Sequence, residues 1–224
     1  MTHDTHDQDQ KIALVTGASR GLGSALAEAL AKRGYHIIAV ARTTGALEEL
    51  DDRIRAAGGH PATLAPMDVI ESPAMLQLTK AIAERWGGLD VWVHTAIHAA
   101  PLGPAGHVDG KDWTKSFAVN ATATQNLVGL MEPLLRARNG TAIIPDDPRG
   151  GEKFFGAYGA SKSAQISLAK SWQAEAERVG PRVLTPEPAP MPTATRGRFY
   201  PGEDRAALSP CADEAEKILA DAGL

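Results

Sequence analysis

Short apolar runs alternate with helical patterns along almost the whole chain. The runs are apolar on both faces, as expected for strands buried between two layers of helices. Such alternation implies right-handed βαβ units and therefore a doubly wound parallel sheet. The predicted strands are Lys11–Thr16, His36–Ala41, Ala62–Met67, Leu89–His94, Thr141–Ile144 and Arg182–Thr185.

Helices are predicted between these strands. Their ranges are Leu22–Arg33, Gly45–Ala57, Pro73–Trp86, Trp113–Arg136 and Ala157–Val179. Within the fourth helix, Asn120 is a poor helix former, so either a local kink that exposes a carbonyl or a merely tolerated asparagine is expected.

The C-terminal part of the chain is rich in proline. Six prolines between Pro181 and Pro201 predict an ordered loop after the sixth strand, without a helix. Ser209 and Pro210 are then expected to be the N-cap and first residue of a final helix that ends near Gly223. No seventh strand follows, so the sheet should have six strands.

Composition limits the classes of function. The 224 residues suit one domain over 11–224, preceded by a polar tail, 1–10, that we expect to be disordered. In the tail, His3 and His6 could bind a metal weakly, but a solvated tail is favoured. A net charge of −4 and no long apolar stretch argue against nucleic-acid and membrane partners. The one cysteine, Cys211, suits a reducing compartment, the cytoplasm.

A glycine-rich run joins the first predicted strand to the first predicted helix. It reads Thr16-Gly17-Ala18-Ser19-Arg20-Gly21-Leu22-Gly23. Gly17 permits a tight turn, Gly21 permits close approach of a pyrophosphate, and Gly23 permits close helix–strand packing. The N–H groups of the helix N-terminus would then face phosphates. This context predicts a dinucleotide-binding loop.

The residues after the second and third strands bear on the choice of dinucleotide. The second strand ends in Ala41-Arg42, where an acidic residue would favour NAD. Arg42 and Arg20 can both pair with a 2′-phosphate, so we predict NADP(H). Asp68 either accepts a hydrogen bond from the adenine amino group or is an ordinary turn aspartate.

Tyr158 and Lys162 are four residues apart and therefore share one helical face. A tyrosine that exchanges a proton at neutral pH needs a lowered pKa, and a nearby ammonium group lowers it. The pair is thus a candidate acid/base site.

With these motifs, the chain resembles the short-chain dehydrogenase/reductase family over nearly its whole length. The matching residues are Thr16-Gly17-x-x-x-Gly21-x-Gly23, Asp68, Leu89-Asp90-Val91, Asn120, Tyr158-x-x-x-Lys162 and Pro188-x-x-x-x-Thr193. The resemblance implies a Rossmann-type fold and NAD(P)-dependent interconversion of a carbonyl and an alcohol. It also implies that Tyr158 is the acid/base, that Lys162 lowers its pKa and holds the ribose, and that Asn120 supports a relay water. The expected cofactor-binding residues are Gly17, Ser19, Arg20, Gly21, Leu22, Gly23, Arg42, Asp68, Val69, Thr95, Tyr158, Lys162, Pro188 and Thr193, of which Thr193 would bond the carboxamide.

The serine that polarises the substrate in this family is missing. Counting from Gly140 puts Asp147 in its place, whereas counting back from Tyr158 puts Pro145 there. We favour Asp147 or its neighbour Asp146. An ionised carboxylate cannot donate to a carbonyl, and it would raise the pKa of Tyr158. Either the aspartate is held neutral, or it binds a cationic or hydroxyl-rich substrate, or catalysis is impaired; a turn that faces solvent is the alternative.

The family's Asn-Asn-Ala-Gly sequence is also altered, to His94-Thr95-Ala96-Ile97. His94 and His98 suggest a metal, but their position at a strand end and in a loop makes that reading unfavoured. By resemblance, a homodimer or homotetramer is expected. Two functions are open: an NADP(H)-dependent oxidoreductase that acts on a small carbonyl or alcohol, and an NADP(H)-binding sensor or scaffold with little or no catalysis.

Overall fold

A six-stranded parallel sheet forms the centre of the protein in the computed structural model, which describes residues 10–224. The strand order is β3-β2-β1-β4-β5-β6, so the predicted doubly wound sheet of six strands is confirmed. The strand order runs outward in opposite directions from β1 and from β4, and a crevice opens between these two strands at their carboxyl ends. The strands are β1 (Ile12–Thr16), β2 (His36–Ala41), β3 (Thr63–Pro66), β4 (Val91–His94), β5 (Thr141–Ile143) and β6 (Arg182–Leu184).

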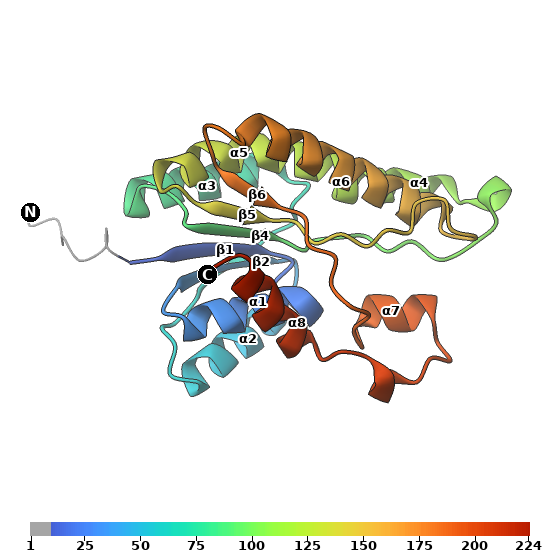
Figure 1. Cartoon of the computed structure of the whole chain (residues 1–224), viewed down its shortest axis with the longest axis horizontal. Coiled ribbons are helices and arrows are strands. Elements are labelled where there is room, and N and C mark those ends of the chain that lie inside the picture. The colour runs from blue at the N-terminus through green and yellow to red at the C-terminus, as the bar shows by residue number, and fades with distance from the viewer. Residues whose placement is uncertain (1–9) are drawn as a thin grey trace, which may run out of the picture.

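Helices cover both faces of the sheet (Figure 1). One face carries α1 (Gly21–Lys32), α2 (Thr44–Ala56) and α8 (Cys211–Asp221), and the other carries α3 (Ser72–Trp86), α5 (Ala123–Ala137) and α6 (Gly156–Ala176). Successive strand residues alternate between the faces, so Ile12 and Leu14 enter one apolar core while Ala13 and Val15 enter the other. This double burial explains why the four central strands, β1, β2, β4 and β5, are mostly apolar.

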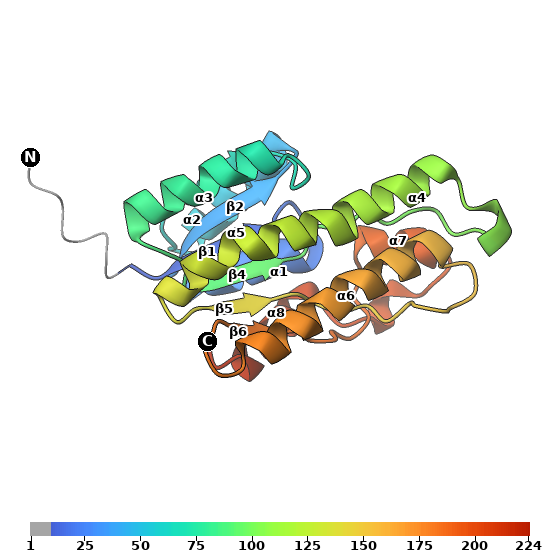
Figure 2. The same ribbon diagram turned by 90° about the horizontal axis from the view of Figure 1, so that it is seen from above.

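The fourth predicted helix is continuous but changes its winding. It consists of α4 (Gly110–Ser116), a π-helical segment (Phe117–Thr122) and α5. Asn120 lies in the π-helical segment and is fully buried. Figure 2 shows this long element beside α6, with α4 extending beyond the sheet. π-helical turns are rare and often mark functional sites, so this one directs attention to Asn120.

Two predictions near the C-terminus are wrong. The proline-rich segment contains a short helix, α7 (Ala194–Phe199), because no proline occurs between 192 and 201 and Thr193 caps its first turn. The last helix begins at Cys211 and not at Pro210, which is the N-cap; the Ser209 hydroxyl instead donates to Glu214 Oε1 at 2.9 Å. The other predicted element boundaries differ from the observed ones by three residues or fewer.

The predicted tail, 1–10, with His3 and His6, lies outside the described residues except for Gln10. Among residues 10–224, no helix combines the length and the apolar character needed to cross a lipid bilayer.

Candidate active site

A cavity of about 330 Å³ opens at the carboxyl ends of the strands. It brings together every residue predicted to bind the cofactor. Those lining residues are Gly17, Ser19, Arg20, Gly21, Leu22, Gly23, Arg42, Asp68, Val69, Thr95, Tyr158, Lys162, Pro188 and Thr193. Asp147 also lines the cavity, whereas Asn120 does not. Residues that are far apart in the sequence therefore line one cavity in the folded chain.

The glycine loop between β1 and α1 passes very close to the end of β4. Gly17 has φ +88°, and a methyl carbon there would lie 2.5 Å from the backbone nitrogen of Ala96. A methyl carbon at Gly23 would collide with the Gly17 carbonyl and the Thr95 hydroxyl. Gly21, with φ +59°, is the first residue of α1, where the backbone N–H groups have no acceptor within the helix. The loop therefore requires glycine, as the sequence predicted, and the helix N-terminus opens into the cavity.

Two arginines lie at the outer end of the cavity. Arg42 follows β2, its side chain is 60% exposed, and its Nη1 lies 3.9 Å from Asp68 Oδ2. Arg20 is the exposed N-cap residue of α1. Asp68 Oδ1 also accepts a hydrogen bond at 3.3 Å from the Ile70 N–H, so the turn role considered for this residue is present. Both guanidinium groups remain accessible to an anion.

The segment before α7 closes another side of the cavity. Thr193 Oγ1 accepts from the Arg196 N–H at 3.1 Å, and a methyl carbon on Gly21 would lie 3.4 Å from Thr193 Cγ2. Thr193 thus lies against the glycine loop. Glu214 of α8 holds the same segment by accepting from the Ala189 N–H at 2.9 Å.

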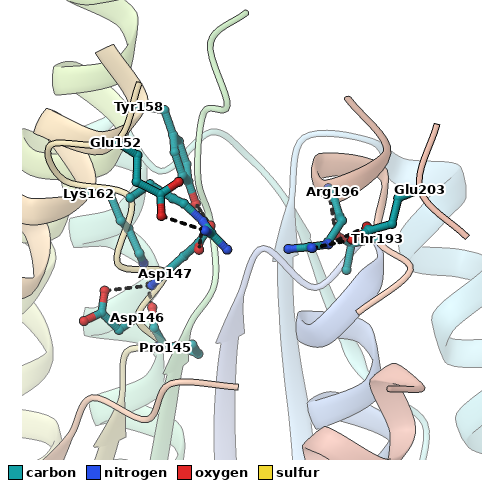
Figure 3. A network of polar contacts seen from close by, with 10 residues as sticks. Pro145, Asp146, Asp147, Glu152, Tyr158, Lys162, Thr193, Arg196 and Glu203 are labelled. Atoms are coloured by element: carbon teal, nitrogen blue, oxygen red, sulfur yellow. Dashed lines mark hydrogen bonds and ion pairs between the residues drawn. The ribbon is translucent and has the colours of Figure 1, made fainter. Parts of the chain in front are cut away.

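Tyr158 is almost completely buried, and its hydroxyl faces Asp147 (Figure 3). It donates a hydrogen bond to Asp147 Oδ2 at 2.9 Å. The other carboxylate oxygen, Oδ1, accepts from Arg149 Nε at 2.8 Å, and Arg149 Nη1 lies 2.9 Å from Glu152 Oε1. The Asp147 side chain is therefore turned toward the tyrosine and accepts hydrogen bonds on both oxygens.

The electrostatics of Tyr158 differ from the expectation. Burial raises its pKa, and the charge and hydrogen bond of Asp147 raise it further, against a smaller lowering by Arg149. Lys162 was expected to lower this pKa, but its Nζ donates to the Pro145 carbonyl and to Gln165 Oε1, both at 2.6 Å. The expected pKa shift is thus reversed, first because the phenol is buried and second because its hydrogen-bonding partner is an anion.

Lys162 is itself perturbed. Burial lowers its pKa to about 8, against the opposing effect of Asp146 and Asp147. The ammonium form therefore still predominates at neutral pH.

Asn120 binds the loop that follows β4. Its amide nitrogen donates to the His98 carbonyl at 3.0 Å and to Ser161 Oγ at 2.9 Å, and its Oδ1 accepts from the His98 N–H at 2.7 Å. Its own carbonyl accepts from Thr124 Oγ1 at 2.8 Å. The side chain therefore joins this loop to α6 from behind the cavity.

Sequence reasoning missed several residues of the site. Arg149 could have been suspected, because it follows Asp147 by two positions, and Gln165 because it is a polar residue one helical turn after Lys162. His94 was considered only as a metal ligand or as a change of motif. It is buried, burial lowers its pKa to about 3, and no cluster of three or more metal-ligating side chains is found within 10–224.

The family model described as short chain dehydrogenase matches residues 11–204. The chain belongs to this family. It is 31% identical to 2,3-dihydro-2,3-dihydroxybenzoate dehydrogenase of Bacillus subtilis over 163 aligned residues. The alignment covers 71% of this chain and 62% of the Bacillus protein. It is 29% identical over 197 residues to D-threitol dehydrogenase of Mycolicibacterium smegmatis, covering 87% and 75% of the two chains. The matched part spans less than two thirds of the Bacillus protein, and 15% of a glycine betaine reductase of Emericella nidulans that is 30% identical.

Solved structures of the family have the same fold. A short chain dehydrogenase from Shigella flexneri complexed with NADP superimposes with a TM-score of 0.84 at 27% identity, covering 92% of this chain and 89% of that one. A metagenomic short-chain oxidoreductase in complex with NADP gives a TM-score of 0.80 at 28% identity, with coverage of 96% and 91%.

Proposed function

We propose that this protein is an NADP(H)-dependent oxidoreductase that interconverts a carbonyl and an alcohol on a small molecule. Membership of the short-chain dehydrogenase family supports the oxidoreductase class, and the two NADP complexes among its structural neighbours support the coenzyme. The glycine loop fits the pyrophosphate, and Arg20 and Arg42 at the open end of the cavity fit a 2′-phosphate.

One observation carries the proposal: Tyr158 and Lys162 line the same cavity as the glycine loop. When bound there, the coenzyme supplies or accepts a hydride at its nicotinamide carbon. Tyr158 holds a proton on its phenolic oxygen and gives it to the substrate oxygen as the carbonyl is reduced. Asp147 keeps Tyr158 protonated but also makes the phenol a weaker proton donor, because the tyrosinate left after the transfer would face the carboxylate. Lys162 uses two N–H groups internally and keeps a third to bond the ribose.

The replacement Tyr158→Phe tests this assignment. NADPH consumption should be followed with a panel of aldehydes, ketones, quinones and imines, and NADPH binding should be measured separately by fluorescence. The variant should lose turnover while its affinity for NADPH stays within about twofold, because the proton donor is removed and the phosphate contacts remain. Tyr200→Phe is the matched control, since Tyr200 also lines the cavity. Unchanged turnover in Tyr158→Phe would remove this residue from the mechanism.

A second function is supported by Asp147. A carboxylate that accepts from both Tyr158 and Arg149 cannot polarise a substrate carbonyl, which favours an NADP(H)-binding protein with slow turnover, a sensor or a scaffold. Tight NADPH binding without consumption by any member of the panel would support this alternative.

Assembly as a homodimer or homotetramer and a cytoplasmic location accompany the proposal. The resemblance places the interface on the helices over 113–136 and 157–179. Trp113 on α4 is 45% exposed and its ring centre lies 4.6 Å from that of Phe117, and this exposed aromatic ring supports the first of these helices as part of the interface. Light scattering would measure the assembly.

A further inference from the structure

A chain of buried polar side chains runs from the catalytic lysine to the glycine loop. Lys162 Nζ donates to Gln165 Oε1 at 2.6 Å, and Gln165 Nε2 donates to Thr124 Oγ1 at 2.8 Å. His94 Nε2 lies 2.9 Å from Thr124 Oγ1, and His94 Nδ1 lies 2.7 Å from Thr16 Oγ1. Thr16 is the last residue of β1 and directly precedes Gly17. All five side chains are buried.

The directions of these hydrogen bonds are consistent with one another. Gln165 accepts from the ammonium group and donates to the threonine, so both ends of its amide are used. If the Thr124 hydroxyl donates to the Asn120 carbonyl at 2.8 Å, the neutral His94 must donate from Nε2 and accept from Thr16 at Nδ1. The single proton of the Thr16 hydroxyl is then directed to His94 at 2.7 Å and not to the Val93 carbonyl, which lies farther away at 3.1 Å. The histidine stays neutral because burial holds its pKa near 3. Every member is thus satisfied, as a network buried this deeply requires.

We propose that Gln165, Thr124 and His94 are positioning residues that hold the Lys162 ammonium group in the cavity and tie it to the strand that carries the glycine loop. The inference rests on the proposed function only in taking Lys162 as the residue that bonds the ribose of the coenzyme. None of these three side chains belongs to the Tyr158-x-x-x-Lys162 motif, so the motif alone does not predict this role for them.

Lys162 needs these positioning residues because burying an ammonium group in a protein interior is energetically costly. Such a group needs hydrogen-bond acceptors, and Lys162 has two, the Pro145 carbonyl and Gln165 Oε1. The ionisable groups that face it from neighbouring elements are Asp146 and Asp147 on the loop after β5 and neutral His94 on β4.

Tyr158, which lies on the same helix as Lys162, is protonated. Loss of the Gln165 oxygen therefore leaves the ammonium with one fixed acceptor, and its pKa should fall.

The test uses Gln165→Met, which keeps the length of the side chain and removes the acceptor. The titration of Lys162 is followed by NMR of the cofactor-free protein labelled with ¹³C at lysine Cε, with Lys162→Arg to identify the signal. We expect the midpoint to move about one pH unit downward from its position in the parent, near 8, because a hydrogen bond to a charged group is lost. As the pH is raised, the affinity of the variant for NADPH should begin to fall about one pH unit earlier than that of the parent, since the ammonium form of Lys162 binds the ribose.

The chain offers a matched control in Gln173→Met. Gln173 lies on the same helix and makes a single hydrogen bond, to the Val183 carbonyl at 2.7 Å, away from Lys162. It should leave the lysine titration unchanged. An equal midpoint in Gln165→Met and the parent would overturn the inference, as would an equal displacement in the control.

A second pair of variants covers the case in which Gln165→Met does not fold. Thr124→Val keeps the shape and removes the hydroxyl that orients Gln165, whereas Thr124→Ser keeps the hydroxyl. The Lys162 titration midpoint should be lower in Thr124→Val than in the parent, whereas Thr124→Ser should keep the parent value. Identical titrations of Thr124→Val and the parent would refute the role of Thr124. The NMR readout needs no substrate, so a failure of the proposed function, seen as no turnover in the parent, is distinguishable from a failure of this inference.

Discussion

Replacement of Arg42 by alanine should weaken NADPH binding selectively. Arg42 follows the second strand at the point where the adenosine ribose would lie, and its side chain is 60% exposed. NADH lacks the 2′-phosphate, so its affinity should change by less than about twofold, whereas that of NADPH should fall by roughly five- to tenfold.

The magnitude follows from what Arg42 now contacts. Its only described ion pair, with Asp68, is 3.9 Å long and exposed, and such a pair contributes ~1 kcal/mol at most. A charge-assisted hydrogen bond to phosphate contributes ~1.5–3 kcal/mol, toward the lower end at an exposed site. With ~0.5 kcal/mol for the exposed pair, the middle of its range, and ~1.5–1.9 kcal/mol for the phosphate contact, the net gain on binding is ~1–1.4 kcal/mol, which corresponds to the five- to tenfold change.

The assay is a fluorescence titration of each cofactor at low and at high ionic strength. Arg55→Ala is a matched control, because Arg55 is 59% exposed and pairs with Asp51 at 3.6 Å on α2, away from the cavity. The difference between NADPH and NADH should shrink as salt screens the phosphate contact. If the parent and Arg42→Ala give superimposable NADPH curves, the assignment of the 2′-phosphate site is wrong.

Three other changes test the rest of the site. Asp147→Ser should raise ketone reduction by about tenfold, because serine donates to a carbonyl and the charge that raises the pKa of Tyr158 is gone; slower NADPH consumption would instead give the carboxylate a positive role. Gly23→Ala should lower the free energy of unfolding by ~1–3 kcal/mol, measured by denaturant titration, because its methyl group collides with backbone, whereas Gly45→Ala meets open space and should have little effect. Glu214→Gln should cost ~1–2 kcal/mol at neutral pH. Burial opposes ionisation of Glu214, but its hydrogen bonds lower its pKa; its contribution is therefore present above the unfolded-state pKa and lost as acid protonates the folded state, so unfolding curves of parent and variant should converge below about pH 4.

The fold was predictable because its signal is repeated. The four central strands, β1, β2, β4 and β5, are buried on both faces, so each appears as a mostly apolar run, and the glycine loop fixes which run comes first. The short helix α7 was missed because the prolines on either side of it dominated the pattern. Its capping residue, Thr193, had been noticed only as a cofactor contact.

The lining of the cavity was predictable for a different reason. Residues at the carboxyl ends of parallel strands must meet at one edge, so Gly17, Arg42, Asp68 and Thr95 converge once the strand order is known. The contacts behind the lining were not predictable. Gln165 and Thr124 are ordinary helical residues in sequence, and only the crossing of α5 and α6 brings their side chains together. Long-range pairs of this kind have no fixed spacing along the chain.

Asp147 illustrates how far a motif determines chemistry. The spacing of Tyr158 and Lys162 places both in the cavity, but it does not set the proton affinity of the phenol. That affinity depends on a carboxylate eleven residues earlier, and the carboxylate in turn depends on Arg149, which holds one of its oxygens while the tyrosine binds the other. Since burial and an acceptor-only partner both stabilise the protonated tyrosine, the phenol keeps its proton at neutral pH but gives it up less readily, which is why replacing Asp147 is expected to speed reduction.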